Sequence, residues 1–224
     1  MTFSSLSTAQ RCAEWVYGWC ASRGFDAPQQ SGVAFWSYPN EDGRERELLW
    51  PDPGTVIDAD LLATIGAWSR PTWATVATHD VSSTQGILAE RGVVPAGWPE
   101  WLMSTELGLH DQAACPNGFT STIELRDGVL TGEVRGPANE LACSGRMALT
   151  PRGGAVADRI VTEEGFRRRG FGRYMMTELG SAAQAAGATY GLLIASVEGH
   201  ALYEAISWSS DCDIVVARNT AAMA

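Results

Sequence analysis

A strand, an arginine- and glycine-rich turn and a helix follow one another late in the chain, and this order limits the fold more than any other stretch. Residues 167–173 read Arg-Arg-Arg-Gly-Phe-Gly-Arg, between apolar residues 160–162 and a helical segment at 174–186. The first amides of a helix lack partners within it, and the helix dipole places positive charge at that end. Glycines let an anion approach the backbone, and arginines add charged donors. The stretch therefore predicts a site for a phosphate-bearing ligand.

Composition shows that the basic stretch is a local feature, although a basic helix start that is merely solvated remains the alternative until the later segments are considered. Four of the sixteen basic residues fall within residues 167–173, although the formal net charge of the chain is −10. The arginines are therefore concentrated at one place rather than spread through the chain.

A second segment follows at a fixed distance from the turn. An apolar strand is expected at 190–195, and the motif after it consists of Ser196, Gly199, Leu202, Tyr203 and Trp208. With Arg167, Gly170 and Gly172 in the first motif, this pattern resembles the Gcn5-related N-acetyltransferase (GNAT) family. The resemblance covers roughly residues 119–217. It departs from the family at Ser196, where the family has Asn, and at Ser207, where the family has Gly.

The resemblance implies an α/β fold with a mixed, mostly antiparallel sheet flanked by helices, and a cofactor, acetyl-CoA or another acyl-CoA. In the family, backbone amides of the strand before the turn bind the pantetheine arm and polarise the carbonyl. Carried over to this chain, the cofactor-binding residues are Ile160, Val161, Thr162, Arg167, Arg168, Arg169, Gly170, Phe171, Gly172, Arg173 and Ser196.

Two catalytic residues are expected. By resemblance, Tyr203 donates a proton to the departing thiolate; the alternative is a tyrosine that only packs its ring. Asp158 is the acidic residue within the strand expected at 155–162, which makes it a candidate base, and an ion pair with Arg159 is the alternative. Glu163, Glu164 and His200 remain further candidates for the base, and the proton could also leave through water.

The expected elements divide the chain into two lobes. The first, 1–115, combines helices at 8–23, 58–68 and 81–91 with a hairpin at 32–38 and 46–50 and a strand at 73–78. The second, 116–224, is the GNAT-like lobe and begins with an antiparallel meander at 119–125, 129–135, 141–149 and 155–162. We expect the first lobe to shape the acceptor pocket, and it could be a reduced GNAT-like half.

Only about ten residues separate Trp208 from the loose tail, so the two final strands of the family should be short here. An incomplete end would leave a sheet edge that a second copy of the chain could cover in a homodimer.

The composition of the chain limits the kinds of partner that we expect it to bind. An acidic chain disfavours nucleic acid and anionic membranes, and it suits a cationic amine. All sixteen basic residues are Arg, which excludes lysine Schiff bases and the P-loop lysine. Five scattered cysteines indicate reduced thiols in a cytoplasmic protein, no metal site is expected, and no stretch has the apolar length of a membrane span.

These observations predict an N-acetyltransferase that transfers an acetyl or other acyl group to the amine of a small molecule, aminoglycoside-like or derived from an amino acid. The alternative is a protein that binds acyl-CoA without turnover and serves as a regulator or partner subunit.

Overall fold

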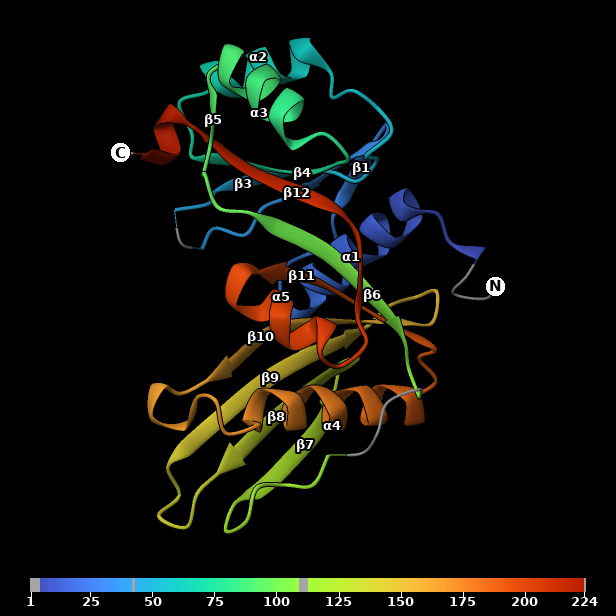
Figure 1. Cartoon of the computed structure of the whole chain (residues 1–224). Coiled ribbons are helices and arrows are strands. Elements are labelled where there is room, and N and C mark those ends of the chain that lie inside the picture. The colour runs from blue at the N-terminus through green and yellow to red at the C-terminus, as the bar shows by residue number, and fades with distance from the viewer. Residues whose placement is uncertain (1–4, 42, 109–112, 224) are drawn as a thin grey trace.

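The computed structural model describes residues 5–41, 43–108 and 113–223. In this part of the chain one sheet of twelve strands runs through both lobes (Figure 1). The first lobe contains α1 (Thr8–Arg23), β1 (Gln29–Ser31), β2 (Ala34–Ser37), β3 (Arg46–Trp50), α2 (Ala59–Ala67), β4 (Thr72–Thr78), α3 (Val81–Glu90), β5 (Val93–Pro95) and β6 (Glu100–Glu106). The second contains β7 (Thr120–Arg126), β8 (Val129–Arg135), β9 (Leu141–Leu149), β10 (Gly154–Thr162), η2 (Glu164–Phe166), α4 (Phe171–Ala185), β11 (Tyr190–Ser196), α5 (Val197–Glu204), β12 (Ser209–Asn219) and η3 (Thr220–Met223).

Local signals in the sequence explain where the helices begin and end. Ser7 and Gln10 form a reciprocal capping box at the start of α1, and Gly24 ends the helix with a left-handed φ of 72°. Asp58 caps α2 by accepting hydrogen bonds from the amides of Asp60 and Leu61. The predicted helices of the first lobe and its hairpin of β2 and β3 are confirmed.

The second lobe begins with the predicted antiparallel meander, β7 to β10. Helix α4 packs on one face of it, in a core that includes Met147, Met175 and Leu179. Helix α1 covers the opposite face, where Trp19 and Val156 belong to a second core cluster. The sheet of the second lobe therefore lies between a helix from each half of the chain (Figure 1).

The C-terminal segment differs from the expectation of two short strands and an open edge. A single strand of eleven residues, β12, pairs antiparallel with both β4 and β6. It runs inside the sheet, in the order β4-β12-β6-β11, and offers no free edge for a second copy of the chain. The expectation of short strands was wrong because the residues after Trp208 stay extended through Asn219. The buried side chain of Asn219 accepts a hydrogen bond from the Thr72 amide and donates to the carbonyls of Ile65 and Trp68.

The two lobes are thereby joined, because each contributes a strand to the other's part of the sheet. The last strand of the first lobe, β6, pairs with β11 of the second lobe, while the last strand of the second lobe pairs with β4 of the first. No helix in the described part of the chain has the length and apolar character needed to cross a membrane.

Candidate functional site

The sheet opens between β10 and β11. These parallel strands pair over only three residues, and the last pair is Val156 with Leu192, although both strands continue further. On its other side β10 has an irregularity between Asp158 and Val161, where Arg159 adopts a φ of 52°. The β11-facing edge of β10 beyond Val156 therefore has no strand partner among the described residues, which leaves backbone groups available to a ligand. This edge contains the predicted residues 160–162.

The arginine turn leads from this opening into α4. Arg168 and Gly170 have left-handed φ values of 60° and 87°, and Gly170 is the N-cap of α4 without any side-chain capping bond. A Cβ built on Gly170 would meet nothing within 4 Å. The start of α4 thus presents amides and the positive end of its dipole to open space, a geometry that fits a phosphate group.

The four arginines of the turn differ in their contacts. Arg168 is exposed. Arg167 donates to the carbonyl of Thr162 at 3.3 Å, and Arg173 to that of Ala205 at 3.4 Å. Arg169 is also an exposed residue, but its guanidinium lies 5.4–5.6 Å from the ring centres of three phenylalanines, Phe119, Phe166 and Phe171.

Within the described residues none of these four arginines forms an ion pair with a carboxylate. Their charge therefore remains available to an anion, and Arg168 is the least engaged of them.

The remaining predicted cofactor residues serve local structure as well. Phe171 is buried in the core under α4. A Cβ on Gly172 would lie 3.0 Å from Leu202, so glycine allows α4 to approach α5. Ser196 caps α5 by accepting a hydrogen bond from the amide of Gly199 at 3.3 Å. Whether Ser196 also contacts a cofactor stays a prediction.

Tyr203 lies on α5 and is only 9% exposed. Its hydroxyl forms no hydrogen bond to any residue that the structure describes. Burial, with smaller contributions from Asp158 and Cys143, raises the pKa of Tyr203 to about 12. The phenol therefore stays protonated at neutral pH and can donate a proton.

A cavity of about 170 Å³ lies where the two lobes meet, beside the opening between β10 and β11. Its walls come from α1, β3, β4, β6, β10, β11, β12 and α5, so most of them are supplied by segments far apart in the sequence. Residues of both core clusters line it: Trp15 and Ile194 belong to the cluster under α1, and Ala157 and Tyr203 to the cluster under α4. The cavity thus connects the two faces of the sheet at its opening.

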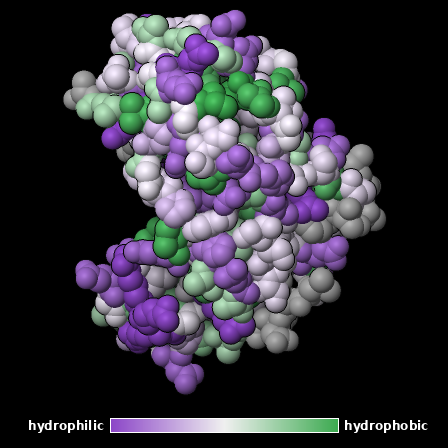
Figure 2. All heavy atoms as spheres, turned by 45° about the horizontal axis from the view of Figure 1, so that its top comes forward, coloured by the Kyte–Doolittle hydropathy of each residue, from purple (hydrophilic) through white to green (hydrophobic). Residues whose placement is uncertain are grey.

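The surface shows the same junction from outside. Figure 2 shows a hollow at the left edge between the upper and lower lobes, with hydrophilic side chains gathered on the lower lobe beside it. The arginine turn projects from the same side of the lower lobe in Figure 1.

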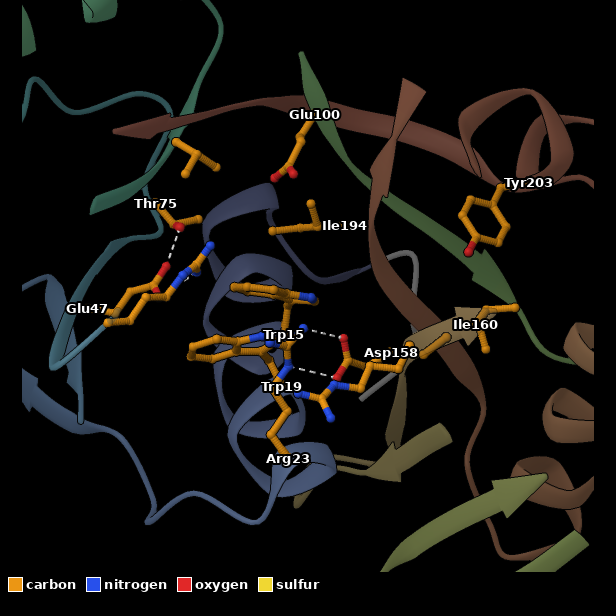
Figure 3. Close-up of a pocket in the computed structure, with 14 residues that line it drawn as sticks. Trp15, Trp19, Arg23, Glu47, Thr75, Glu100, Asp158, Ile160, Ile194 and Tyr203 are labelled. Atoms are coloured by element: carbon orange, nitrogen blue, oxygen red, sulfur yellow. Dashed lines mark hydrogen bonds and ion pairs between the residues drawn. The ribbon is translucent and has the colours of Figure 1, made fainter. Parts of the chain in front are cut away.

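Asp158 occupies a wall of this cavity but is held by other residues (Figure 3). The Arg23 guanidinium donates to both of its carboxylate oxygens, at 2.9 and 3.0 Å, and Ser22 adds a third hydrogen bond at 2.9 Å. Arg159, the partner that the sequence suggested, pairs with Glu41 instead. Both oxygens of the Asp158 carboxylate are thus occupied by residues of α1, which weakens the hypothesis that Asp158 is the base.

The other predicted candidates for the base do not line the cavity. Glu163 and Glu164 are exposed. His200 packs against Trp101 with ring centres 4.3 Å apart, and its Nε2 lies 3.0 Å from the Ser210 hydroxyl.

Two glutamates that the sequence analysis did not single out line the cavity instead. Glu47 on β3 is buried, accepting hydrogen bonds from the Thr75 hydroxyl at 2.6 Å and from Arg44 at 2.8 Å. Glu100, at the start of β6, extends its carboxylate toward the cavity (Figure 3). Burial raises the pKa of Glu100. Its only sequence signal is an acidic residue between two tryptophans, Trp98 and Trp101, which does not by itself indicate a site.

Comparison with known proteins supports the fold but gives no sequence relative. The sequence matches no protein-family model and no curated protein. A GCN5-related N-acetyltransferase from Kribbella flavida has a similar structure, with a TM-score of 0.72 at 15% identity over 98% of this chain and 96% of that chain. One from Sphaerobacter thermophilus has a TM-score of 0.62 at 11% identity, over 94% of this chain and 92% of that chain.

A tandem GNAT protein from the clavulanic acid biosynthesis pathway, in a structure without AcCoA, has a TM-score of 0.60 at 14% identity, over 86% of this chain and 81% of that chain. The chain therefore has the fold of the GCN5-related N-acetyltransferases, as the two sequence motifs predicted. The similarity extends over nearly the whole chain, including the first lobe, which carries neither motif.

Proposed function

We propose that this protein is an N-acyltransferase that transfers an acetyl or other acyl group from acyl-CoA to the amine of a small molecule. The proposal is supported by the opening between β10 and β11. The unpaired strand edge and the arginine turn lie on one side of this opening, and the cavity with Tyr203 lies on the other. An acyl donor and an acceptor could meet there from opposite faces of the sheet.

The cofactor would be held mainly by the backbone and the turn. The amides at the start of α4 and the Arg168 side chain would bind the pyrophosphate, and the free edge of β10 at 160–162 would bind the pantetheine arm. When bound, acyl-CoA supplies an activated thioester. The unpaired amides of β10 would polarise its carbonyl and stabilise the negative charge that develops on the oxygen.

Tyr203 would act as the general acid. Its hydroxyl has no competing hydrogen-bond partner among the described residues and belongs to the wall of the cavity. With a pKa of about 12 it would deliver a proton to the leaving sulfur at any pH at which the amine is reactive.

We also propose that residues 1–115 are a reduced copy of the GNAT-like lobe, 116–224. Both lobes contain a parallel strand pair joined by a helix, then a second helix and a closing strand: β3-α2-β4-α3-β6 and β10-α4-β11-α5-β12. In the first lobe the strand pair stays closed over five residues, from Arg46 to Trp50, and the Asp58 carboxylate occupies the anion position of α2. The first lobe would thus shape the acceptor pocket without binding a second cofactor.

The alternative, a protein that binds acyl-CoA without turnover, differs in one measurable way: it would release no thiol with any amine. A cytoplasmic location and a homodimer stay predictions, and the homodimer has no support from a free edge at β12.

The test of the cofactor site uses Arg168, an exposed arginine of the turn whose side chain forms no hydrogen bond or ion pair with the described residues. Arg168→Glu should weaken acetyl-CoA binding in a calorimetric titration by about ten- to a hundredfold, because a charged hydrogen bond is worth about 1.5–3 kcal/mol. Arg126→Glu is the matched control, since it makes the same charge change at an exposed arginine at the end of β7. Equal affinities for both variants would exclude the turn as the phosphate site.

A further inference from the structure

Most charged side chains around the cavity form an ion pair with a side chain of opposite charge. Arg23 pairs with Asp158, Arg44 with Glu47, and Arg159 with Glu41. The remaining ionisable groups in the wall are Glu100 and Tyr203. Tyr203 is neutral at ordinary pH, which leaves Glu100 as the one carboxylate of the wall that forms no ion pair with an arginine among the described residues.

Glu100 is held in place without being neutralised. It lies on β6, opposite Ser196 of β11 on one side and Ile214 of β12 on the other. Within the described part of the chain it forms no ion pair with an arginine, and the Trp98 side chain donates a hydrogen bond to it. A partly buried carboxylate of this kind attracts a single cation strongly, because water screens the charge only in part.

The walls next to Glu100 are aromatic and apolar. Trp15 and Trp19 stack on each other with ring centres 5.6 Å apart, and both line the cavity beside Ile194 (Figure 3). Indole faces bind flat apolar groups and cations. At about 170 Å³ the cavity is close in size to a cavity of roughly 150 Å³ that holds one benzene molecule. A molecule as large as an aminoglycoside would extend beyond this space.

We propose that the acceptor is a small monoamine with a flat apolar body, such as an arylalkylamine, and that Glu100 both binds its ammonium group and takes its proton. This inference rests on the proposed acyltransferase function and narrows its substrate class. It replaces the aminoglycoside-like acceptors suggested by net charge alone with an amine of one positive charge and about the size of benzylamine.

Glu100, Tyr203 and solvent together account for every proton and electron pair in the proposed reaction. The Glu100 carboxylate accepts one proton from the ammonium nitrogen, which frees the lone pair. That lone pair forms the bond to the acyl carbon as the carbon–sulfur bond breaks, and the Tyr203 hydroxyl gives a proton to the sulfur. After the attack the nitrogen carries a positive charge and releases its second proton to water, the Tyr203 phenolate regains a proton from water, and Glu100 returns its proton to solvent after the products leave.

The acid limb of the pH profile tests Glu100 as the base. The groups that surround it are Arg44 and Glu47 from the β3 side, Trp98 on its own segment, and Arg23 with Asp158 across the cavity. Burial outweighs the favourable charge of Arg44 and raises the pKa of Glu100. Because the base must be ionised, kcat/KM should fall as the pH drops through this raised pKa.

The experiment compares Glu100→Gln with Glu106→Gln, an exposed glutamate on the same strand that is outside the cavity. Thiol release is followed with benzylamine, methylamine, spermidine and kanamycin as acceptors, across the acid pH range. We expect benzylamine to be preferred, Glu100→Gln to lower its kcat/KM by about 10²-fold or more and to abolish the acid limb, and Glu106→Gln to behave as the unmodified chain.

Binding of benzylamine without acyl-CoA, followed by NMR, gives a second readout. It separates failure of this inference from failure of the proposed function. A preference for spermidine or kanamycin, or an unchanged Glu100→Gln enzyme, overturns the inference while acyl transfer stands. If no amine is acylated, the acyltransferase proposal fails; benzylamine binding that Glu100→Gln weakens at least tenfold would then still support the amine site, and binding that it leaves unchanged would overturn it.

Discussion

Tyr203 combines the features that a proton donor needs. It is nearly buried, its hydroxyl is free of hydrogen bonds to the described residues, and its ring is held by Trp208 with centres 6.1 Å apart. A Cβ on Gly199 would come within 2.8 Å of the Tyr203 ring, so glycine one turn earlier in α5 makes room for it. The small residue and the tyrosine of the second motif are therefore linked by packing.

Replacement of Tyr203 by phenylalanine should separate binding from chemistry. The ring and its contacts remain, so affinity for acetyl-CoA and the unfolding midpoint should stay as they are, while kcat falls by about 10²–10⁴-fold. Steady-state thiol release together with calorimetry measures both quantities. An unchanged kcat would mean that the proton reaches the sulfur by another route.

The residues of the site differ in how well the sequence could predict them. The arginine turn and Tyr203 belong to short local motifs, so the resemblance of those motifs to the GNAT family could indicate them. Glu47 and Glu100 acquire their position only when β3 and β6 join strands from the far end of the chain. Asp158 was chosen for its place on β10, and its partner Arg23 comes from a helix 135 residues away.

At the scale of elements, the contact between α1 and β10 sets one wall of the cavity. The helix approaches the strand at Gly18, where a Cβ would lie 2.3 Å from Val156 Cγ2. Trp15, Trp19 and Arg23 lie on the same helix and reach the cavity from there. The spacing between α1 and the sheet therefore determines how deep the cavity is.

Gly18→Ala should destabilise the protein by about 1–3 kcal/mol, because the added methyl group forces the helix or Val156 to move in a packed core. The control is Gly86→Ala in α3, where nothing lies within 4 Å of the new Cβ, and a gain of about 0.5–1 kcal/mol is expected from helix propensity. Urea unfolding of the two variants measures the difference. Stabilisation by both substitutions would contradict the close packing of α1 on β10.

Most elements of both lobes followed from caps, turns and alternation, and their bounds agree with the expected ranges to within a few residues. The sequence did not predict the short strands β1 and β5, nor the place of β6 and β12 in the middle of the sheet. The central position of β6 and β12 comes from pairing between residues more than ninety positions apart, as between Ser196 and Glu100 or Arg218 and Trp73. Local sequence patterns do not indicate such long-range pairing.

At the scale of the whole molecule, the exchange of β6 and β12 joins the lobes into one sheet. Buried titratable groups are found in both core clusters that meet at the cavity. Burial raises the pKa of Cys20 to about 11 and, together with smaller effects, those of Tyr190 and Tyr203 to about 12 each. In the unfolded chain these groups ionise at lower pH, about 8.5 for cysteine and about 10 for tyrosine.

The protein should therefore lose stability in alkali. The folded state binds more of these protons than the unfolded state once the pH exceeds the unfolded pKa values, so stability falls as pH rises toward 11–12. The contribution of these groups is fully present below about pH 8. Thermal unfolding followed by circular dichroism should give a Tm that declines steadily above about pH 9, and less steeply in Tyr203→Phe. A constant Tm from pH 8 to 11 would speak against the burial of these groups.

The central claim is that the opening between β10 and β11 is a site of acyl transfer. The most direct measurement mixes the purified protein with acetyl-CoA and benzylamine and quantifies products by mass spectrometry. We expect N-acetylbenzylamine and free CoA in equal amounts, formed at a rate proportional to protein concentration. Binding of acetyl-CoA in calorimetry without formation of either product, with benzylamine or any other amine, would contradict it and favour a protein that only binds acyl-CoA.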